Sequence, residues 1–405
     1  MKNQFDIIIV GGGLVGLALA CALAQQTPLT IAVLEAQAFE AKPHSPLATT
    51  IPTSALSYHH RVSAITLASQ RFLKKLQIWD KIPVERRGRF HQIQVWDAIN
   101  HKEIYFDSKD IGESHLAWII ENAIIQFAMK ATLSHYPQVT SFCPVQLLAI
   151  KKQAQHIELI SGDKQIFQAK LAIAADGAQS WLRTQSGIAN HYLPYHQTAL
   201  VTNVCTSLPH QQIARQVFLT TGPLAFLPLS SPNTSSIVWS LSHDEAKHIQ
   251  SMPEALFKDK LAAAFEYRLG NILKTSERYA FPLFHQQAHN YVSSGVALVG
   301  DAAHTVHPLA GQGVNLGLRD VESLAMIIAE AIKKQQNFAS QVNLRRYERW
   351  RKADNLPMLW GIDALKNIFA SEKKSIRTLR GMGLTILNQS PLIKNFLTQY
   401  AVGNH

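Results

Sequence analysis

The feature that most constrains this chain is a glycine cluster between two short apolar runs near its N-terminus. The run from Phe5 to Val10 leads into Gly11-Gly12-Gly13-Leu14-Val15-Gly16, which satisfies the pattern G-x-G-x-x-G, and a helix of small and apolar residues is predicted over 14–26. A second apolar run over 29–34 ends at Glu35, nineteen residues after the last of these glycines. This order of strand, glycine turn, helix, strand and acid is the fingerprint of a dinucleotide-binding βαβ unit.

Each residue of the fingerprint has a physical reason. Gly11 allows a tight turn, Gly13 lets the backbone approach a pyrophosphate, and Gly16 lets the helix pack closely on the strand. Val15 lies in the same turn and is counted with them as a cofactor-binding position. Glu35 can accept a hydrogen bond from a ribose hydroxyl, which favours FAD or NAD over NADP.

A second glycine-rich stretch, near residue 300, has a related layout. An apolar run over 296–299 precedes Gly300-Asp301, and a glycine-containing loop over 302–313 leads to a helix predicted over 314–332. A carboxylate at a strand end is thus followed by a helix N-terminus, which offers free N–H groups and the positive end of a helix dipole. Such a site suits a polar, chargeable ring system.

The rest of the chain contains strand-like and helical segments. A buried strand over 171–175 ends in Asp176-Gly177, three runs between 146 and 167 suggest a meander, and 192–279 predicts a mainly antiparallel second lobe. Two further strands are expected over 92–96 and 103–107, helices over 61–76, 122–133 and 253–267, and helical structure after residue 332. Phe218, Phe226 and Trp239 could line an aromatic-substrate pocket, although a place in the core is favoured.

Composition narrows the class of protein. With 405 residues the chain is long enough for two or three domains. Its three scattered cysteines form no C-x-x-C pair, which indicates a reducing compartment rather than a disulfide framework or a zinc site. His304 and His307 have H-x-x-H spacing without a third ligand, so no metal is expected.

The net charge of +11 is unevenly spread. The basic C-terminal region, Leu344 to Arg380, holds ten Lys or Arg against four acids. It fits a solvated helix face, an acidic partner protein or an anionic membrane surface, and nucleic acid is the weakest option because no RNA-binding aromatic signature accompanies it. The uncharged run from Ile7 to Ala24 contains four glycines, so we expect a cytoplasmic protein without signal peptide or transmembrane helix, with peripheral membrane contact as an option.

Three motifs stand in an order that resembles a known family. The glycine fingerprint with Glu35, Asp176-Gly177 with Ser180 and Arg183, and Gly300-Asp301 are similar to those of the class A flavoprotein aromatic hydroxylases, the para-hydroxybenzoate hydroxylase superfamily. Within it, the stretch from 307 to 317 resembles the ubiquinone-biosynthesis hydroxylases. Further stretches resemble the branch usually called 2-polyprenylphenol 6-hydroxylase, namely 61–65, 114–116, 214–218, 224–230, 237–242 and 345–349. One departure is Ala175, where the family often has glycine.

The resemblance implies an α/β fold. A Rossmann-like FAD-binding domain of the glutathione-reductase type would carry an inserted, mainly antiparallel β-sheet substrate domain and a C-terminal helical region. The expected boundaries are 1–75, 108–190 and 280–340 for the discontinuous FAD-binding domain, 76–107 and 191–279 for the substrate lobe, and 341–405 for the C-terminal region.

The resemblance also implies FAD as cofactor, O2 as co-substrate and NAD(P)H or another reductant as electron donor. Arg61 and Asn122 match flavin-contacting positions, Asp301 would bind the ribityl chain, and Gly311 to Asn315 would lie along the isoalloxazine ring. Pro308 would shape the reacting face, and backbone N–H groups of Gly313, Val314 and Asn315 would stabilise negative charge on reduced flavin. The other expected cofactor-binding residues are Gly11, Gly13, Val15, Gly16, Glu35, Asp176, Gly300 and Gln312. No side-chain acid or base is assigned.

The implied reaction is hydroxylation of the aromatic ring of a polyprenylphenol in ubiquinone biosynthesis, through a flavin C4a-hydroperoxide. The expected position is C5, the 6-position of a 2-polyprenylphenol. Alternatives are a sister hydroxylase acting at another ring carbon, a same-fold flavin-dependent isoprenoid reductase, and a non-catalytic flavin- or lipid-binding subunit. The implied partners are the polyprenylphenol lipid, a multiprotein ubiquinone-biosynthesis complex and a membrane surface contacted through the basic C-terminal region.

Overall fold

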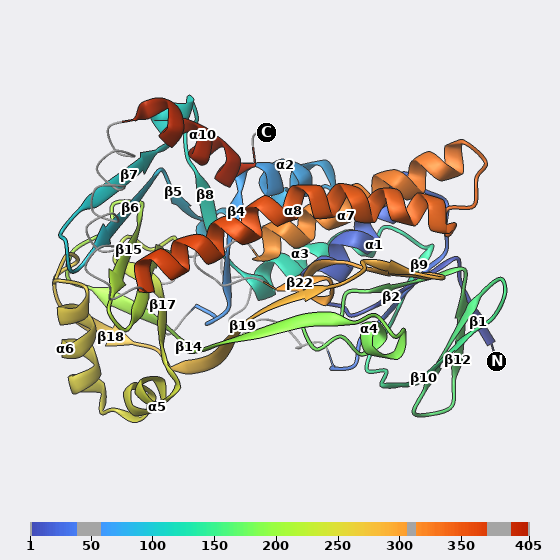
Figure 1. The fold of residues 1–405 in the computed structure, drawn as a ribbon, viewed down its shortest axis with the longest axis horizontal. Coiled ribbons are helices and arrows are strands. Elements are labelled where there is room, and N and C mark those ends of the chain that lie inside the picture. The colour runs from blue at the N-terminus through green and yellow to red at the C-terminus, as the bar shows by residue number, and fades with distance from the viewer. Residues whose placement is uncertain (1, 39–57, 306–312, 371–389, 404–405) are drawn as a thin grey trace.

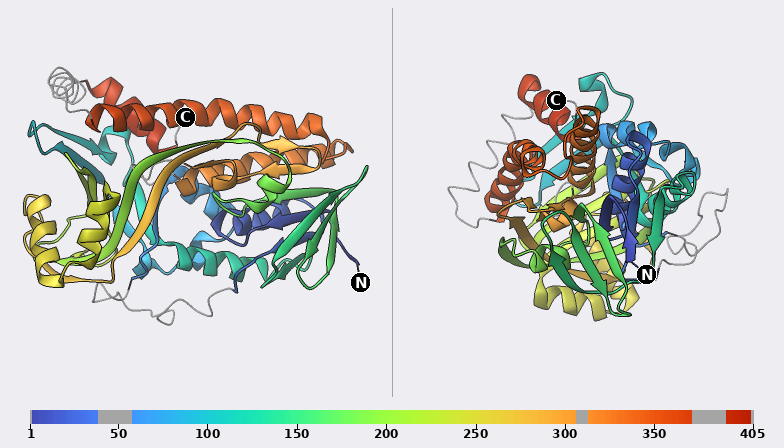
Figure 2. Two further views of the ribbon diagram at one scale, coloured as in Figure 1. Left: turned by 60° about the horizontal axis from the view of Figure 1, so that its bottom comes forward. Right: turned by 90° about the vertical axis from the view of Figure 1, so that its right-hand side faces the viewer.

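The computed structural model describes residues 2–38, 58–305, 313–370 and 390–403, with the backbone alone for 356–370. The molecule is elongated, with a parallel sheet and its helices at one end and a large, mostly antiparallel sheet at the other (Figure 1). Two strands, β14 (Asn190–Thr206) and β19 (Tyr279–Ala288), run side by side between the two ends (Figure 2). The structure therefore agrees with the predicted fold class.

A six-stranded sheet forms the core of the first end, in the order β20–β21–β13–β2–β3–β9. Its strands are β20 (Val292–Ser293), β21 (Val296–Leu298), β13 (Leu171–Ala174), β2 (Ile7–Val10), β3 (Ile31–Leu34) and β9 (Val139–Phe142), and β20 alone pairs antiparallel. Every residue of β2, β3, β13 and β21 is buried, which explains why these strands read as uninterrupted apolar runs.

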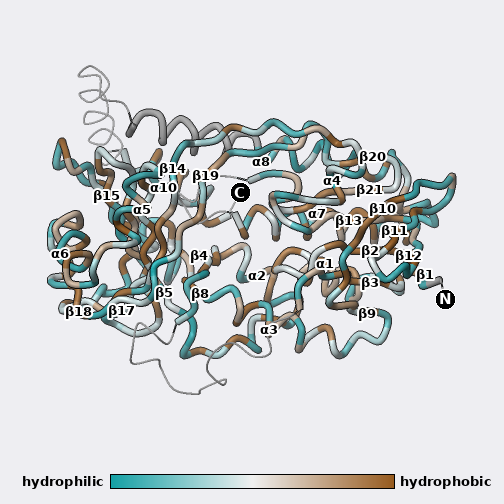
Figure 3. The backbone as a smooth tube through the Cα atoms, turned by 90° about the horizontal axis from the view of Figure 1, so that it is seen from below, coloured by the Kyte–Doolittle hydropathy of each residue, from teal (hydrophilic) through white to brown (hydrophobic). Residues whose placement is uncertain are grey.

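Helices cover this sheet, and smaller sheets flank it. Helix α1 (Leu14–Gln26) lies against both α3 (Asn122–Leu133) and α7 (Gly313–Lys333), and apolar residues concentrate around α1, β2 and β13 (Figure 3). The predicted meander is confirmed as β10 (Leu147–Lys152), β11 (Ile157–Ser161) and β12 (Ile166–Ala169), to which β1 (Lys2–Gln4) adds a strand.

The three-stranded sheet β4–β8–β5 corrects one prediction. Residues 62–66, predicted to open a helix, form strand β4 (Val62–Thr66), which pairs with β8 (Ala117–Glu121), and β8 pairs with β5 (Gly88–Phe90). Helix α2 (Leu67–Lys75) starts only after Thr66, whose side chain accepts a hydrogen bond from the Ser69 N–H. The β-branched residues of 62–66 favour a strand, and Thr66 is the N-cap that marks the true helix start.

The nine-stranded sheet forms the other end, in the order β22–β19–β14–β17–β16–β15–β6–β7, with β18 also pairing β14. Its remaining strands are β22 (His304–Thr305), β17 (Thr234–Ser242), β16 (Gly222–Pro228), β15 (Ile213–Leu219), β6 (Gln92–Asp97), β7 (Glu103–Asp107) and β18 (Ile272–Thr275). The two strands predicted within 92–107 therefore belong to this sheet.

Two helices cover one face of this sheet. They are α5 (His243–Ser251) and α6 (Glu254–Ala264), where one helix over 253–267 was expected. The missed helix has a clear start signal, a capping box formed by Ser242 and Glu245. Phe226 and Trp239 lie in the core beneath these helices, so the structure favours the core interpretation over an aromatic-substrate pocket.

The C-terminal part of the described chain is helical. Helix α8 (Gln341–Ala370) runs alongside α7 for much of the molecule, and α10 (Pro391–Val402) contacts β7 (Figures 1 and 2). Two short helices follow strands of the six-stranded sheet, η5 (Gly300–Ala302) after β21 and α4 (Trp181–Gln185) after β13, and a third, η4 (Ser108–Ile111), contacts α10. None of the helices over the described ranges is both long and apolar enough to cross a membrane.

Candidate cofactor and substrate site

The three fingerprint glycines occupy different environments. Gly11 has φ +108°, and a Cβ there would lie 2.3 Å from the carbonyl oxygen of Ala175, while a Cβ at Gly16 would lie 2.0 Å from the carbonyl oxygen of Gly11. At Gly13 a Cβ would meet no atom within 4 Å. Gly13 is also the N-cap of α1, which has no side-chain cap. An uncapped helix N-terminus facing open space is an anion site that fits a pyrophosphate.

Glu35 lies at the end of β3, beside the glycine turn. Its Oε2 accepts a hydrogen bond from the Gly12 N–H at 2.6 Å, and its Oε1 accepts from the Gln37 N–H at 2.9 Å. A carboxylate has about four acceptor positions, so Glu35 can still accept from a ribose hydroxyl. Its orientation is already set by the two backbone groups.

Asp176 and Arg183 connect two of the predicted motifs. One carboxylate oxygen of Asp176 accepts from a backbone N–H of α4, and its buried Oδ1 has no hydrogen-bond partner among the described residues. Burial raises the pKa of Asp176. The guanidinium of Arg183 donates to the carbonyl oxygens of Ala178 and Ala302, both at 2.9 Å. The turn after β13 is thereby tied to the turn that carries Asp301.

Asp301 is exposed to solvent, although protein surrounds most of its side chain. The resulting desolvation raises the pKa of Asp301, and the charges of His304 and Arg61 partly offset this shift. A carboxylate that is enclosed by protein but still reaches solvent lines a hollow. The charge of Arg61 acts on Asp301 although 240 residues separate them in the sequence, so the fold brings these two predicted positions together.

Arg61, immediately before β4, lies beside Asn122, the first residue of α3. The Asn122 N–H donates to the Arg61 carbonyl at 2.9 Å, and the Asn122 side chain accepts from the Ser63 hydroxyl at 2.6 Å. The Arg61 guanidinium lies over the ring of Phe281, 5.5 Å from its centroid. Their contact with flavin stays a prediction, which this shared location supports.

The N-terminus of α7 is fixed through Asn315. The Asn315 Oδ1 accepts from the Thr66 N–H at 3.1 Å, and its Nδ2 donates to the Ala64 carbonyl at 2.7 Å. Gly313 and Val314 begin the helix, and a Cβ at Gly313 would meet no other described residue within 4 Å. The buried side chain of Asn315 is thus occupied with β4, and the backbone remains the part that can face a ring. The predicted positions Pro308, Gly311 and Gln312 lie outside the described residues.

Val15 packs behind this site. A Cβ at Gly300 would lie 3.0 Å from a methyl group of Val15, and a Cβ at Gly317 would lie 2.6 Å from it. Val15 therefore interlocks α1 with α7 and with the turn before Asp301. Gly317 was present in the motif, but its packing role required knowing that α1 and α7 cross at this point.

Sequence analysis did not single out the residues that fix the segment from Tyr58 to Arg61. Nδ2 of Asn203 donates to the carbonyl of Tyr58 at 2.9 Å and to that of His59 at 3.3 Å, and Glu121 accepts from the His59 N–H at 2.7 Å. Asn203 is 145 residues away from Tyr58, and Glu121 is 62 residues away from His59. No local pattern could have marked either side chain.

The face of the nine-stranded sheet that meets this segment is identified by three contacts. Asn203 reaches Tyr58 and His59, the ring of Tyr279 stacks on His60 with centroids 3.8 Å apart, and Phe281 lies under Arg61. Directly opposite residues on paired strands share a face. The register therefore shows which other side chains lie on the side of the candidate flavin site.

One row of that face crosses six strands, and we call it the inner stripe. It consists of Tyr279, Val201, Val238, Ala225, Gln216 and Val95, each the register partner of the next. All six residues are partly exposed. On five of these strands the adjacent residue points to the opposite face of the sheet and is buried under α5 and α6. These adjacent residues are Leu200, Trp239, Leu224, Val217 and Trp96. The inner stripe is thus a largely apolar surface that extends away from the Arg61 region.

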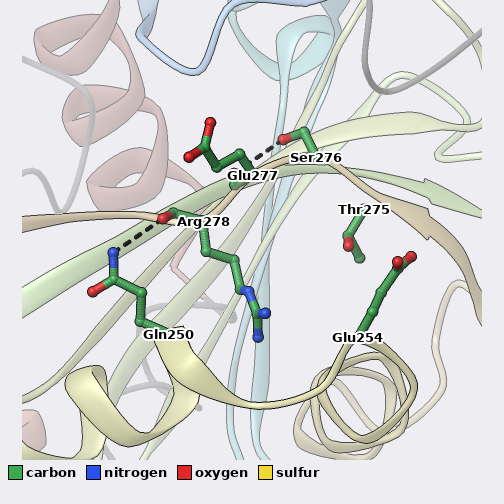
Figure 4. A pocket seen from close by; sticks show the side chains of 6 residues that line it. All are labelled: Gln250, Glu254, Thr275, Ser276, Glu277 and Arg278. Atoms are coloured by element: carbon green, nitrogen blue, oxygen red, sulfur yellow. Dashed lines mark hydrogen bonds between the residues drawn. The ribbon is translucent and has the colours of Figure 1, made fainter.

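A polar hollow of about 450 Å³ lies elsewhere, between α5, α6 and the strand ends (Figure 4). Gln250 donates to the carbonyl of Arg278 at 3.1 Å, and the Arg278 guanidinium donates to the Ile249 carbonyl at 2.8 Å. Glu254 and Glu277 also line it. The hollow borders the end of the inner stripe, where the Tyr279 hydroxyl donates to Glu277 Oε2 at 2.8 Å, but its polar lining does not suit an aromatic lipid.

Comparisons with known proteins decide the family. A family model described as an FAD binding domain matches residues 149–355. The chain is 36% identical over 407 residues to a 3-demethoxyubiquinol 3-hydroxylase of Escherichia coli (strain K12), across 100% of both chains. The chain belongs to the FAD-dependent hydroxylases of ubiquinone biosynthesis. It is also 32% identical over 398 residues to the ubiquinone hydroxylase UbiL of Rhodospirillum rubrum, which covers 98% of this chain and 89% of the relative.

A solved structure supports the fold. The p-nitrophenol 4-monooxygenase PnpA from Pseudomonas putida DLL-E4 matches all of the chain with a TM-score of 0.78 at 17% sequence identity. These findings confirm the predicted resemblance and the assignment as an FAD-dependent monooxygenase that uses O2 and a reductant. The residues present fit FAD, because the N-terminus of α1 has no side-chain cap, one buried oxygen of Asp176 has no partner among the described residues, and Asp301 is exposed.

Proposed function

We propose that this hydroxylase oxidises the ring of a polyprenylated phenol whose apolar part lies along the inner stripe. The observation that carries the proposal is the register of the sheet, which lines up Val201, Val238, Ala225 and Val95 as a partly exposed row beginning beside Arg61. An extended hydrocarbon chain fits such a row, since burying apolar area contributes about 25 cal/mol per Å². A small polar phenol would not need it.

The residues have separate tasks in this proposal. FAD, when bound, supplies the activation of O2 for transfer to the ring. Glu35 and the N–H groups after Gly13 would hold the nucleotide end, and Asp301 would hold the ribityl chain. The backbone at Gly313 and Val314 would stabilise negative charge near the ring, and the inner stripe would orient the phenol and exclude water.

We propose ring carbon C5, the 6-position of a 2-polyprenylphenol, as the site of hydroxylation. This rests on the stretches that resemble that branch, among them 214–218 and 237–242, which lie on β15 and β17 of the substrate sheet. The name of the Escherichia coli relative favours a second candidate, hydroxylation at position 3 of a demethoxyubiquinol. Both reactions require the same flavin site.

Deletion of the gene separates the two candidates. Accumulation of 2-polyprenylphenol in the lipid extract, reversed by the wild-type chain, supports hydroxylation at C5. Accumulation of a methoxylated demethoxyubiquinol assigns the chain to the second candidate. Unchanged ubiquinone content with no intermediate would refute both, provided that no second hydroxylase gene is present.

We propose in addition that the basic C-terminal region contacts an anionic membrane or an assembly partner. Within its described part Arg345 and Arg349 are exposed, whereas Arg346 pairs with Glu330 and Arg351 is buried against Asp320. Arg345 and Arg349 thus supply exposed positive charge. Sedimentation with anionic vesicles should fall as salt rises; binding that is absent or indifferent to salt would count against the contact.

A further inference from the structure

Asp320 is a fully buried carboxylate on α7, seven residues after Gly313 at the start of that helix. Its Oδ2 accepts from the Gly300 N–H at 2.9 Å and from His304 Nε2 at 2.6 Å, and its Oδ1 accepts from Arg351 Nε at 2.8 Å. Three donors from three elements therefore meet on a single carboxylate.

Two of these donors bracket Asp301. Gly300 comes immediately before it and His304 comes three residues after it, so both ends of the turn are fixed to the same oxygen atom. Gly300 also has φ +61° and lies against Val15, so the turn has little freedom on its other side. The carboxylate of Asp301 projects from a turn whose conformation is set by Asp320.

The charge of Asp320 is balanced from α8. Arg351 is itself buried, and its other nitrogens donate to Asp354 and Asn355. Burial alone would raise the pKa of Asp320, but His304 and Arg351 hold it below its ordinary range. An ionised acceptor bonded by charged donors makes stronger hydrogen bonds than a neutral one, and removing one member of such a buried set is costly because its partners stay buried.

We propose that Asp320, together with His304 and Arg351, is the positioning residue for FAD: it holds the turn over 300–304 so that Asp301 meets the ribityl chain. The group touches neither the substrate nor the candidate ring position. The proposal rests on FAD as the cofactor and is independent of which phenol is hydroxylated.

A matched pair at His304 tests the proposal. In His304→Gln the side-chain amide can still donate to Asp320, whereas His304→Leu keeps bulk and loses the donor. We expect His304→Gln to bind FAD within a few-fold of wild type and His304→Leu to bind about tenfold more weakly or worse, as expected for a lost hydrogen bond to a charged group. FAD titration of the apo protein by fluorescence quenching measures both, and the flavin absorption spectrum reports a changed environment.

Asp320→Asn and Tyr347→Phe complete the design. Asp320→Asn should lower FAD affinity at least as much as His304→Leu. Tyr347→Phe removes a 2.7 Å hydrogen bond from α8 to the Leu298 carbonyl, close to the same turn, and leaves the hydrogen bonds of Gly300 and His304 to Asp320 in place. It should lower the melting temperature of the apo protein and leave FAD affinity unchanged.

Two results would overturn the proposal: equal FAD affinity in the two His304 variants, or a loss in Tyr347→Phe as large as that in His304→Leu. Should Asp320→Asn fail to fold, the His304 pair still decides. Because FAD titration uses no phenol, the proposed substrate could prove wrong while this result stands.

Discussion

Replacing Gly13 by alanine should separate cofactor binding from folding. The backbone at Gly13 has φ −72° and ψ −175°, which alanine adopts without strain, and apart from its chain neighbours the new methyl group would meet no described residue within 4 Å. Loss of glycine also reduces the entropy of the unfolded chain, which stabilises a protein by about 0.4–1 kcal/mol at an unstrained position. The apo protein should therefore keep or slightly raise its melting temperature.

FAD binding should respond in the opposite direction. The methyl group would occupy the space that we assign to the pyrophosphate, and one or two charge-assisted hydrogen bonds to the N-terminus of α1 would be lost. Each is worth about 1.5–3 kcal/mol, and about 1.4 kcal/mol corresponds to tenfold in affinity. Gly13→Ala should thus weaken FAD binding by roughly 10- to 100-fold for each hydrogen bond lost, measured by fluorescence titration of the apo protein.

Gly16→Ala provides the contrast. Its Cβ would lie 2.0 Å from the Gly11 carbonyl oxygen, so α1 must move away from β2 and the apo protein should melt at a clearly lower temperature. If Gly13→Ala bound FAD as tightly as wild type, the pyrophosphate would not approach this helix end. If Gly13→Ala melted early, the space beside it would not be open.

Three further outcomes follow from other contacts. Arg183→Leu leaves the carbonyl oxygen of Ala302 without its donor, while that of Ala178 keeps the hydrogen bond from Gln286. Calorimetry should therefore show an apo protein less stable by about 1–3 kcal/mol, and FAD titration a weaker complex; unchanged values would argue against the tie between the two turns. Val238→Asp places a charge in the inner stripe and should raise KM for a long-chain phenol at least about tenfold, with FAD affinity unchanged; an unaltered KM would remove the stripe from the substrate site. Burial alone would raise the pKa of Glu103. Hydrogen bonds to its carboxylate, above all the one from Arg268, instead lower this pKa from 4.5 to about 2. A lowered carboxyl pKa stabilises the fold above pH 4.5 and loses that contribution as pH falls toward 2, so Glu103→Gln should flatten this part of the pH–stability curve, and an identical acid limb would contradict the assignment.

The parallel sheet and the glycine fingerprint could be predicted because their signals are local. Residues 7–10, 171–174 and 296–298 are buried on both faces, so each strand is an uninterrupted apolar run in the sequence. Gly11 and Gly16 are required by backbone contacts within the same βαβ unit. The end of each strand then predicts Glu35, Asp176 and Asp301 as cofactor-binding positions without any knowledge of long-range packing.

Other features depend on contacts that a linear pattern does not contain. The sequence predicts residues 62–66 as part of the following helix, because their pairing with β8, about 55 residues later in the chain, leaves no signal in the local sequence. The inner stripe includes Ala225 and Gln216, which resemble no binding motif and acquire meaning only through the register of β15 and β16. Asp320 likewise needed the approach of His304 and Arg351.

The inner stripe has a consequence for how this family can change its chemistry. It takes one side chain from each of six strands, at positions spread from Val95 to Tyr279, whereas the nucleotide end is built from compact consecutive motifs. With the phenol placed on the inner stripe as proposed, single substitutions scattered over the sheet would each move the phenol slightly. The ring position that is hydroxylated can therefore change while every flavin motif stays intact. Relatives that share all the motifs can differ in product, and the register positions of the stripe are the places to compare.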